Sequence, residues 1–192
     1  AEIIDPNLRV WYKLDETEGD IIHDASGRGF DSYESSASEK WDPDGGRQGG
    51  ALRCDNDIGF DLPLAVLETV NKGITVSVWL KDAYVEDYNN WVFDAGFGGE
   101  SAPYRMQVLL DGYTEQVMWR AGNDSCDVVL CDWSDIPAPR CCWYPGDWHW
   151  FIFLKDETED RISIYVDCDL AASRDDVDDT LINLRNVPFK IG

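Results

Sequence analysis

Hydrophobic and polar residues alternate with a period of two in several short stretches of the chain. In ITVSVWLK (74–81), apolar residues occupy the even positions, while Thr75, Ser77 and Lys81 point to the opposite side, as in a strand with one buried face. The same pattern predicts further strands at 8–15, 50–55, 90–96, 104–110, 115–120, 148–155 and 161–167. Turns rich in Gly and Asp separate these stretches. Many short strands joined in this way predict an antiparallel β-sandwich.

Helical periodicity is absent from every window of ten or more residues. The segment 63–73 is expected to hold at most one short helical turn, because Pro63 suits a helix start and Gly73 a helix end. The strand WHWFIFLK (148–155) has apolar or aromatic residues on both faces, which predicts that its tryptophans pack in the core. The same burial is expected for Trp79.

The chain is strongly acidic, since 38 Asp and Glu against 16 Lys and Arg give a formal net charge of −22. This charge repels phosphate backbones and anionic membranes, so nucleic acid is not an expected partner. No apolar stretch reaches the roughly 18 residues that span a bilayer, so membrane insertion is not expected. The acidic residues suit a solvated surface, and they also offer oxygen ligands to calcium. Its 192 residues are expected to form a single domain, 1–192.

Six cysteines, an even number, favour disulfides and therefore an oxidising compartment. Adjacent cysteines rarely bond each other, so Cys141 and Cys142 are expected to bond Cys126 and Cys131 in some order. Zinc is the alternative, but the C-x4-C spacing and the presence of only two histidines disfavour it. The first residues, AEIIDPNL, suit either a mature end left by signal-peptide removal or a trimmed chain. We therefore expect a secreted or cell-surface protein.

Five stretches follow one another along the chain: LRVWYKLDETEGDIIHDASGRGFD (8–31), WDPDGGRQGGALRCDND (41–57), ITVSVWLK (74–81), WVFDAG (91–96) and PGDWHWFIFLKDETEDRISIYVD (145–167). In their order and spacing they resemble the laminin G-like, concanavalin A-like superfamily of lectins and glucanases, in its bacterial secreted form. The resemblance covers most of the chain. It implies an all-β, antiparallel jelly-roll sandwich of two curved sheets, with loops that bind glycan or protein at the rim or on the concave face.

Two positions of that family pattern are cysteines in this chain. The family has an aromatic residue followed by Asp-Gly where this chain has CDN (54–56), and Asp-Gly where it has DCD (167–169). Cys54 and Cys168 are therefore expected either to bond each other or to remain buried thiols. The family also has a final strand after the segment that matches FKIG (189–192). Either the chain continues past this segment, or a neighbouring domain or subunit supplies the strand.

Exposed aromatic side chains beside polar ones are the candidates for sugar binding, because a pyranose ring stacks on an open aromatic face while its hydroxyls need hydrogen bonds. The segment 131–147, which the expected disulfides would make rigid, offers Trp133, Trp143, Tyr144, Asp135 and Arg140. Trp91 and Trp119 come second, with Asn89 and Asn90 as polar partners. The alternative for Trp133 and Trp143 is that they only pack the disulfide cluster.

A calcium site is expected from the turn HDASGRGFD (23–31). The resemblance implies Asp24 and Asp31 as ligands, together with backbone carbonyls. The alternative for Asp24 is that its carboxylate caps its own turn.

Catalytic motifs are missing from the sequence. A glycosidase needs two carboxylates that flank a sugar bond, whereas KDETEDR (155–161) and SRDDVDD (173–179) are expected in a turn and a loop. No nucleophile motif is present either. The leading hypothesis is a secreted, non-catalytic, lectin-like module of a larger extracellular protein that binds a neutral glycan. The alternative is a structural or adhesive domain that contacts neighbouring domains or subunits, and a glycoside hydrolase is the third hypothesis.

Overall fold

The computed structural model of the chain describes its strands and many of their connections. The described residues are 5–35, 37, 40–54, 59–71, 73–81, 89–96, 104–111, 114, 116–123, 128–132, 147–156, 158–175, 177, 184 and 187–192. Within them the helical turn expected after Pro63 is the short 3-10 helix η2 (Leu64–Val66). None of the described helices is long and apolar enough to cross a membrane.

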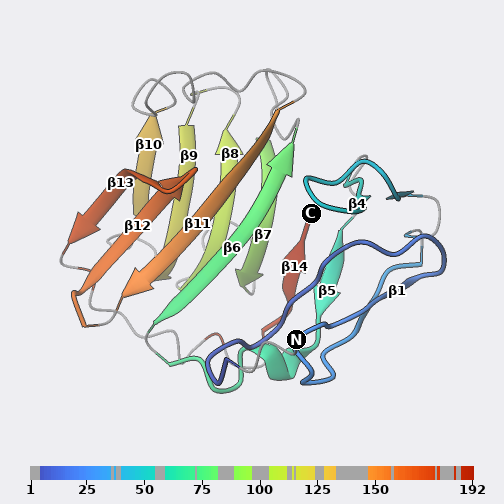
Figure 1. Ribbon diagram of the computed structural model, residues 1–192. Coiled ribbons are helices and arrows are strands. Elements are labelled where there is room, and N and C mark those ends of the chain that lie inside the picture. Colours follow the sequence, from blue (N-terminus) through green and yellow to red (C-terminus); the bar gives the residue numbers. More distant parts are fainter. Residues whose placement is uncertain are drawn as a thin grey trace.

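The larger of two facing antiparallel sheets has eight strands in the described residues (Figure 1). Its order is β1 (Ile21–Ile22), β2 (Ser32–Tyr33), β5 (Phe60–Leu62), β14 (Phe189–Ile191), β7 (Asn89–Gly96), β8 (Tyr104–Asp111), β9 (Gln116–Asn123) and β10 (Val128–Asp132). The segment that matches FKIG thus pairs as β14 between β5 and β7.

The smaller sheet has four strands, and Figure 1 shows it in front of the half of the larger sheet that contains β7 to β10. Its order is β13 (Asp169–Asp175), β12 (Arg161–Val166), β11 (Trp148–Asp156) and β6 (Ile74–Lys81). A separate pair, β3 (Trp41–Asp42) and β4 (Ala51–Leu52), forms a third, two-stranded sheet. The predicted all-β, antiparallel sandwich is confirmed, and the stretch 74–81 coincides with β6.

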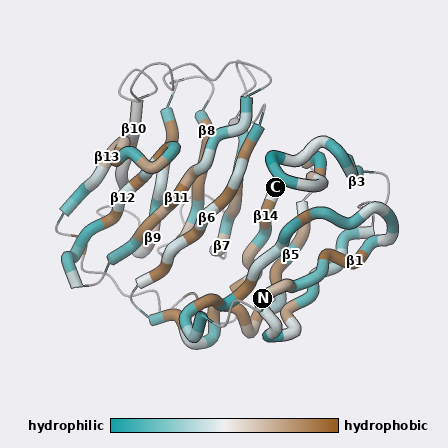
Figure 2. Tube along the Cα trace, viewed as in Figure 1, coloured by the Kyte–Doolittle hydropathy of each residue, from teal (hydrophilic) through white to brown (hydrophobic). Residues whose placement is uncertain are grey.

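The core lies between the two sheets and is rich in aromatic rings. Phe93 on β7 makes edge contacts with Trp119 on β9 and with Phe153 on β11, at centroid distances of 5.7 and 5.8 Å. All three side chains are buried, because alternate residues of each strand point toward the other sheet. Hydrophobic segments lie along the strands of both sheets, whereas the connection around β3 is mainly hydrophilic (Figure 2).

The N-terminal stretch 8–15 is not a strand, contrary to the prediction. It makes an isolated bridge between Tyr12 and Asp24, and its residues Val10, Tyr12 and Leu14 pack against the core. The Tyr12 ring meets Phe60 edge-on at 5.5 Å, so the stretch covers the sheet near β5. The alternating pattern of this stretch therefore correctly predicts that one of its sides is buried, but not that it pairs in a sheet.

The outer face of the four-stranded sheet contradicts the expected burial of Trp79. Along β6 the odd positions are exposed, and 42% of the Trp79 surface is open to solvent. Trp150, its partner on β11, is half-buried on the same outer face, whereas Phe151 and Phe153 face the core. Trp79 occupies an odd position of β6, as do the polar residues Thr75 and Ser77. This shared side of the strand was the sequence signal that could have predicted its exposure.

Candidate functional site

Three polar residues lie side by side on the outer face of the eight-stranded sheet. The strand register pairs Asp94 on β7 with Gln107 on β8, and Gln107 with Arg120 on β9. Their neighbours along each strand, among them Phe93 and Trp119, point into the core, so these three point away from it. We call Asp94, Gln107 and Arg120 the Gln107 row.

Gln107 has only 1% of its surface exposed although it faces away from the core. Its side-chain oxygen Oε1 is buried and accepts no hydrogen bond from the described part of the chain. Leaving a buried acceptor unsatisfied costs about 1–3 kcal/mol, and native proteins rarely tolerate it without a reason. The oxygen is therefore an acceptor for which a donor, such as a hydroxyl, would be favourable.

An apolar row runs beside the Gln107 row on the same outer face. The register joins Trp91 to Leu109, Leu109 to Met118, and Met118 to Leu130. A β-bulge between Trp91 and Phe93 adds one residue to β7, so Trp91 and Phe93 point to opposite faces. Trp91 is half-buried and Leu130 is 51% exposed, so this Trp91 row is partly open to solvent. The face thus combines an aromatic ring with polar side chains, which a sugar site needs.

Trp119, the other strand tryptophan expected to bind sugar, was predicted wrongly. Its side chain is fully buried between the sheets, and its Nε1 donates a hydrogen bond to the backbone oxygen of Leu154 at 3.1 Å. Asn90, expected as a polar partner of Trp91, pairs with core-facing Leu110 and so lies on the opposite face of β7. The loop candidates Trp133, Asp135, Arg140, Trp143 and Tyr144 lie outside the described residues, so they stay predictions.

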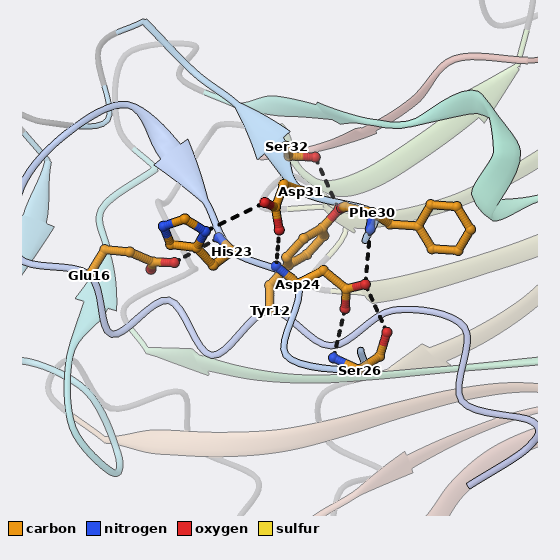
Figure 3. Close-up of polar contacts among 8 residues, drawn as sticks. All are labelled: Tyr12, Glu16, His23, Asp24, Ser26, Phe30, Asp31 and Ser32. Atoms are coloured by element: carbon orange, nitrogen blue, oxygen red, sulfur yellow. Dashed lines mark hydrogen bonds and ion pairs between the residues drawn. The ribbon is translucent and has the colours of Figure 1, made fainter. Parts of the chain in front are cut away.

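Asp24 organises the N-terminal loop by accepting hydrogen bonds (Figure 3). Its Oδ1 accepts from the backbone N–H groups of Trp11 and Ser26, at 3.0 and 2.8 Å. Its Oδ2 accepts from the Ser26 hydroxyl and from Phe30 N–H, at 2.8 and 3.0 Å. Burial alone would raise the pKa of the Asp24 carboxyl, but these hydrogen bonds outweigh it and hold the pKa below 3.8.

The alternative in which Asp24 caps its own turn is therefore the arrangement seen. A carboxylate has about four lone-pair sites, and four donors occupy those of Asp24. Asp31 accepts from the Asp24 N–H at 2.7 Å and lies 3.5 Å from His23 Nδ1. No group of three or more metal-ligating side chains converges within the described ranges. Calcium binding by Asp24 and Asp31 stays an untested prediction.

Tyr12 anchors the same loop to the sheet. Its hydroxyl donates to the backbone oxygen of Phe30 at 2.6 Å and lies 3.0 Å from Ser32 Oγ (Figure 3). Burial raises the pKa of Tyr12 to about 12, with smaller contributions from the nearby carboxylates of Asp24 and Asp31. The loop is therefore a structural unit held together by exposed and partly buried hydrogen bonds.

Cys54 and Cys168 are exposed thiols, so they are neither bonded to each other nor buried as expected. Cys54 follows β4 in the two-stranded sheet, while Cys168 occupies the turn between β12 and β13 in the four-stranded sheet. The two therefore follow strands of different sheets. Cys131 lies in β10, and the remaining cysteines, Cys126, Cys141 and Cys142, lie outside the described residues.

No family model matches the chain, and no curated protein matches it. Among solved structures it is similar to domain 4 of AbnA, a GH43 extracellular arabinanase from Geobacillus stearothermophilus, in complex with arabinotriose. That match has a TM-score of 0.55 and 16% identity, and covers 95% of this chain and 71% of that chain. The CBM40 of Ruminococcus gnavus IT-sialidase, bound to α2,3 sialyllactose, matches with a TM-score of 0.50, 14% identity and 67% of each chain.

The binding domain of botulinum neurotoxin serotype G is also similar, with a TM-score of 0.58 and 12% identity over 88% of this chain and 40% of that chain. At such low identities these similarities concern the fold. They agree with the antiparallel β-sandwich described above. The chain therefore has the antiparallel jelly-roll fold that the resemblance implied.

Proposed function

We propose that the chain is a non-catalytic carbohydrate-binding module that takes a neutral glycan on the outer face of β7, β8 and β9. The observation that carries the proposal is the buried, unsatisfied Oε1 of Gln107 beside the half-buried ring of Trp91. The Trp91 ring would stack on the sugar, and a sugar hydroxyl that reaches the buried oxygen, once the side chains covering Gln107 move aside, would remove the cost of leaving it unsatisfied.

Two of the similar structures support a glycan ligand. The Geobacillus domain is in complex with arabinotriose, and the Ruminococcus module is bound to sialyllactose. We expect a neutral sugar rather than an acidic one, because the net charge of −22 repels anions. The Geobacillus arabinanase is extracellular, which is in line with a secreted module that forms part of a larger protein.

A glycosidase role is less well supported by this face. Glycoside hydrolysis needs two carboxylates about 5–10 Å apart on either side of the sugar bond. The row of Asp94 continues through Lys190 on β14 to a second carboxylate, Asp61 on β5. Lys190 stands between these two carboxylates on the same face, where a glycosidase would place the sugar bond.

The experiment is a glycan array with calcium present, followed by calorimetry on any neutral glycan that binds. Gln107→Leu keeps a similar side-chain volume and removes the unsatisfied oxygen, so we expect an unchanged or higher melting temperature. We also expect binding weaker by at least about tenfold, the equivalent of one lost hydrogen bond to ligand. Trp91→Ala should weaken binding similarly.

Trp143→Ala tests the predicted loop site in the same assay. If it abolishes binding while Gln107→Leu and Trp91→Ala do not, the glycan binds at the loop and the sheet site is wrong. If the unmodified protein binds no glycan and elutes as an oligomer, the structural or adhesive domain replaces the proposal.

A further inference from the structure

Two tryptophans lie together on the outer face of the four-stranded sheet, opposite to the proposed glycan site. The register places Trp79 on β6 directly across from Trp150 on β11. Their rings are stacked, with centroids 6.0 Å apart and planes 13° from parallel. Trp79 is 42% exposed, whereas the core is filled by other aromatic residues, including Trp119. Packing of the core therefore does not account for the pair.

Polar contacts from two further residues hold these rings in place. Trp150 Nε1 donates a hydrogen bond to Ser77 Oγ at 2.7 Å, across the strand boundary. The guanidinium carbon of Arg47, in the connection between β3 and β4, lies 5.4 Å from the centroid of the Trp79 ring. A surface whose side chains are already fixed loses little conformational entropy when a ligand binds.

The apolar surface continues from this pair across the sheet. In the next row, Ile152 on β11 pairs with Tyr165 on β12, and Tyr165 with Leu170 on β13, which is 53% exposed. One row further, Ser163 is 1% exposed and its Oγ has no hydrogen-bond partner among the described residues. Four residues of β11 separate the row of Trp150 from that of Ser163, about 13 Å at the usual strand rise. The surface is thus longer than a single sugar ring.

Within the strands these rows carry no acidic residue, although 38 of the 192 residues are Asp or Glu. All their positions are described: Lys81 with Trp148; Trp79 with Trp150; Ser77 with Ile152, Tyr165 and Leu170; Thr75 with Leu154, Ser163 and Ser173. We call them the Trp79 face. Asp167, in the turn after β12, lies opposite Trp150 and accepts a hydrogen bond from its N–H at 2.9 Å. Acidic residues border the face at both ends, with Asp167 beside Trp150 and Asp175 paired with Arg161 in the last row. In a chain of net charge −22, a face whose strand positions lack acids suits a partner that is itself uncharged.

We propose that the Trp79 face is a second carbohydrate-binding surface, which takes a neutral polysaccharide chain laid across the four-stranded sheet. The exposed part of the Trp79 ring would contact the apolar faces of sugar rings, and Ser77 and Thr75 would meet their hydroxyls. A second copy of this chain is disfavoured as the occupant, because two bodies of charge −22 repel each other. The proposal does not depend on the site at Gln107, which lies on the other sheet.

Retention on insoluble microcrystalline cellulose, chitin and starch granules tests the proposal directly. We expect at least one of these neutral polymers to retain the protein, and Trp79→Ala and Trp150→Ala to weaken retention by at least about tenfold, as for a buried aromatic anchor. Trp79→Thr restores a strand-forming residue if the alanine variant folds poorly. Retention should also be insensitive to salt, because the occupant is uncharged.

Two matched controls separate the Trp79 face from the remaining surface of the protein. Tyr33→Ala removes another exposed aromatic residue, 63% exposed on β2, and should leave retention unchanged. Gln107→Leu tells the two sites apart, because loss of retention in Gln107→Leu but not in Trp79→Ala would assign retention to the site on β7 to β9 and overturn the proposal for the Trp79 face.

Three results would overturn the proposal. The first is that none of the three polymers retains the protein. The second is that Trp79→Ala and Trp79→Thr are retained as well as the unmodified protein. The third is that sedimentation equilibrium shows an oligomer that Trp79→Thr dissociates, since the occupant of the face would then be a second copy of the chain.

Discussion

The turn between β12 and β13 is expected to be strained by its second residue, Cys168. Val166 and Asp169 are paired at the ends of the strands, and the two residues between them have φ values of +50° for Asp167 and +78° for Cys168. Positive φ at both central positions is what a two-residue type I′ hairpin turn needs, and glycine is the preferred second residue. A residue with a Cβ atom in this region costs roughly 1–2 kcal/mol.

Cys168→Gly should therefore raise the free energy of unfolding. The relief of strain is partly offset by the greater entropy of glycine in the unfolded chain, roughly 0.5–1 kcal/mol. The net gain is about 0.5–1 kcal/mol, which corresponds to an increase of about 1–4 °C in melting temperature for a chain of this size. Because Cys168 is exposed, the substitution removes little packing.

Urea unfolding with reductant present measures the difference without thiol oxidation. Cys168→Ala is the matched control, since it removes the thiol but keeps the Cβ atom, and it should give no comparable gain. Cys54→Gly is a second control, because Cys54 is also exposed but is not among the described residues with positive φ. If Cys168→Gly is no more stable than the unmodified protein, or Cys168→Ala gains as much, the strain argument is wrong.

The N-terminal loop supports two further predictions. Since the Asp24 pKa is lowered, the stability that this carboxylate supplies is present above pH 3.8 and lost as the pH falls further. Asp24→Asn should thus cost about 2 kcal/mol in urea unfolding at neutral pH but little in strong acid, and an equal cost at both would refute this. Since the Tyr12 pKa is about 12, the ultraviolet titrations of Tyr12→Phe and the unmodified protein should differ well above pH 10.0. If the two titration curves already differ with a midpoint at pH 10.0, the hydroxyl of Tyr12 is not buried as described.

Much of the larger architecture could be predicted from periodicity. The alternation in 74–81 identified β6 and its two faces, and the stretches 148–155 and 161–167 anticipated β11 and β12 within a residue or so at each end. These strands are long enough for a period of two to show. Short strands such as β1 and β2, of two residues each, have no period to detect, and the prediction missed them.

The burial of individual tryptophans was harder to predict than the strands. Trp79 was expected inside and is exposed, whereas Trp119 was expected at the surface and is fully buried. Both predictions relied on residue type, which does not distinguish the two cases, because tryptophan is equally suited to a core and to a binding surface. Parity within the strand was the better guide, since Trp79 shares its side with Ser77, and Trp119 lies on the opposite side from Arg120.

The sequence by itself determined that this chain folds as an antiparallel β-sandwich, because alternation and turn residues act locally and can be detected in one strand at a time. Only the tertiary structure decided which residues meet across strands. Asp94, Gln107 and Arg120 form one row, and Trp79 stacks on Trp150, through pairings between segments distant in sequence. The register of those pairings depends on a bulge in β7 and on packing between the sheets, and no single stretch of sequence encodes either.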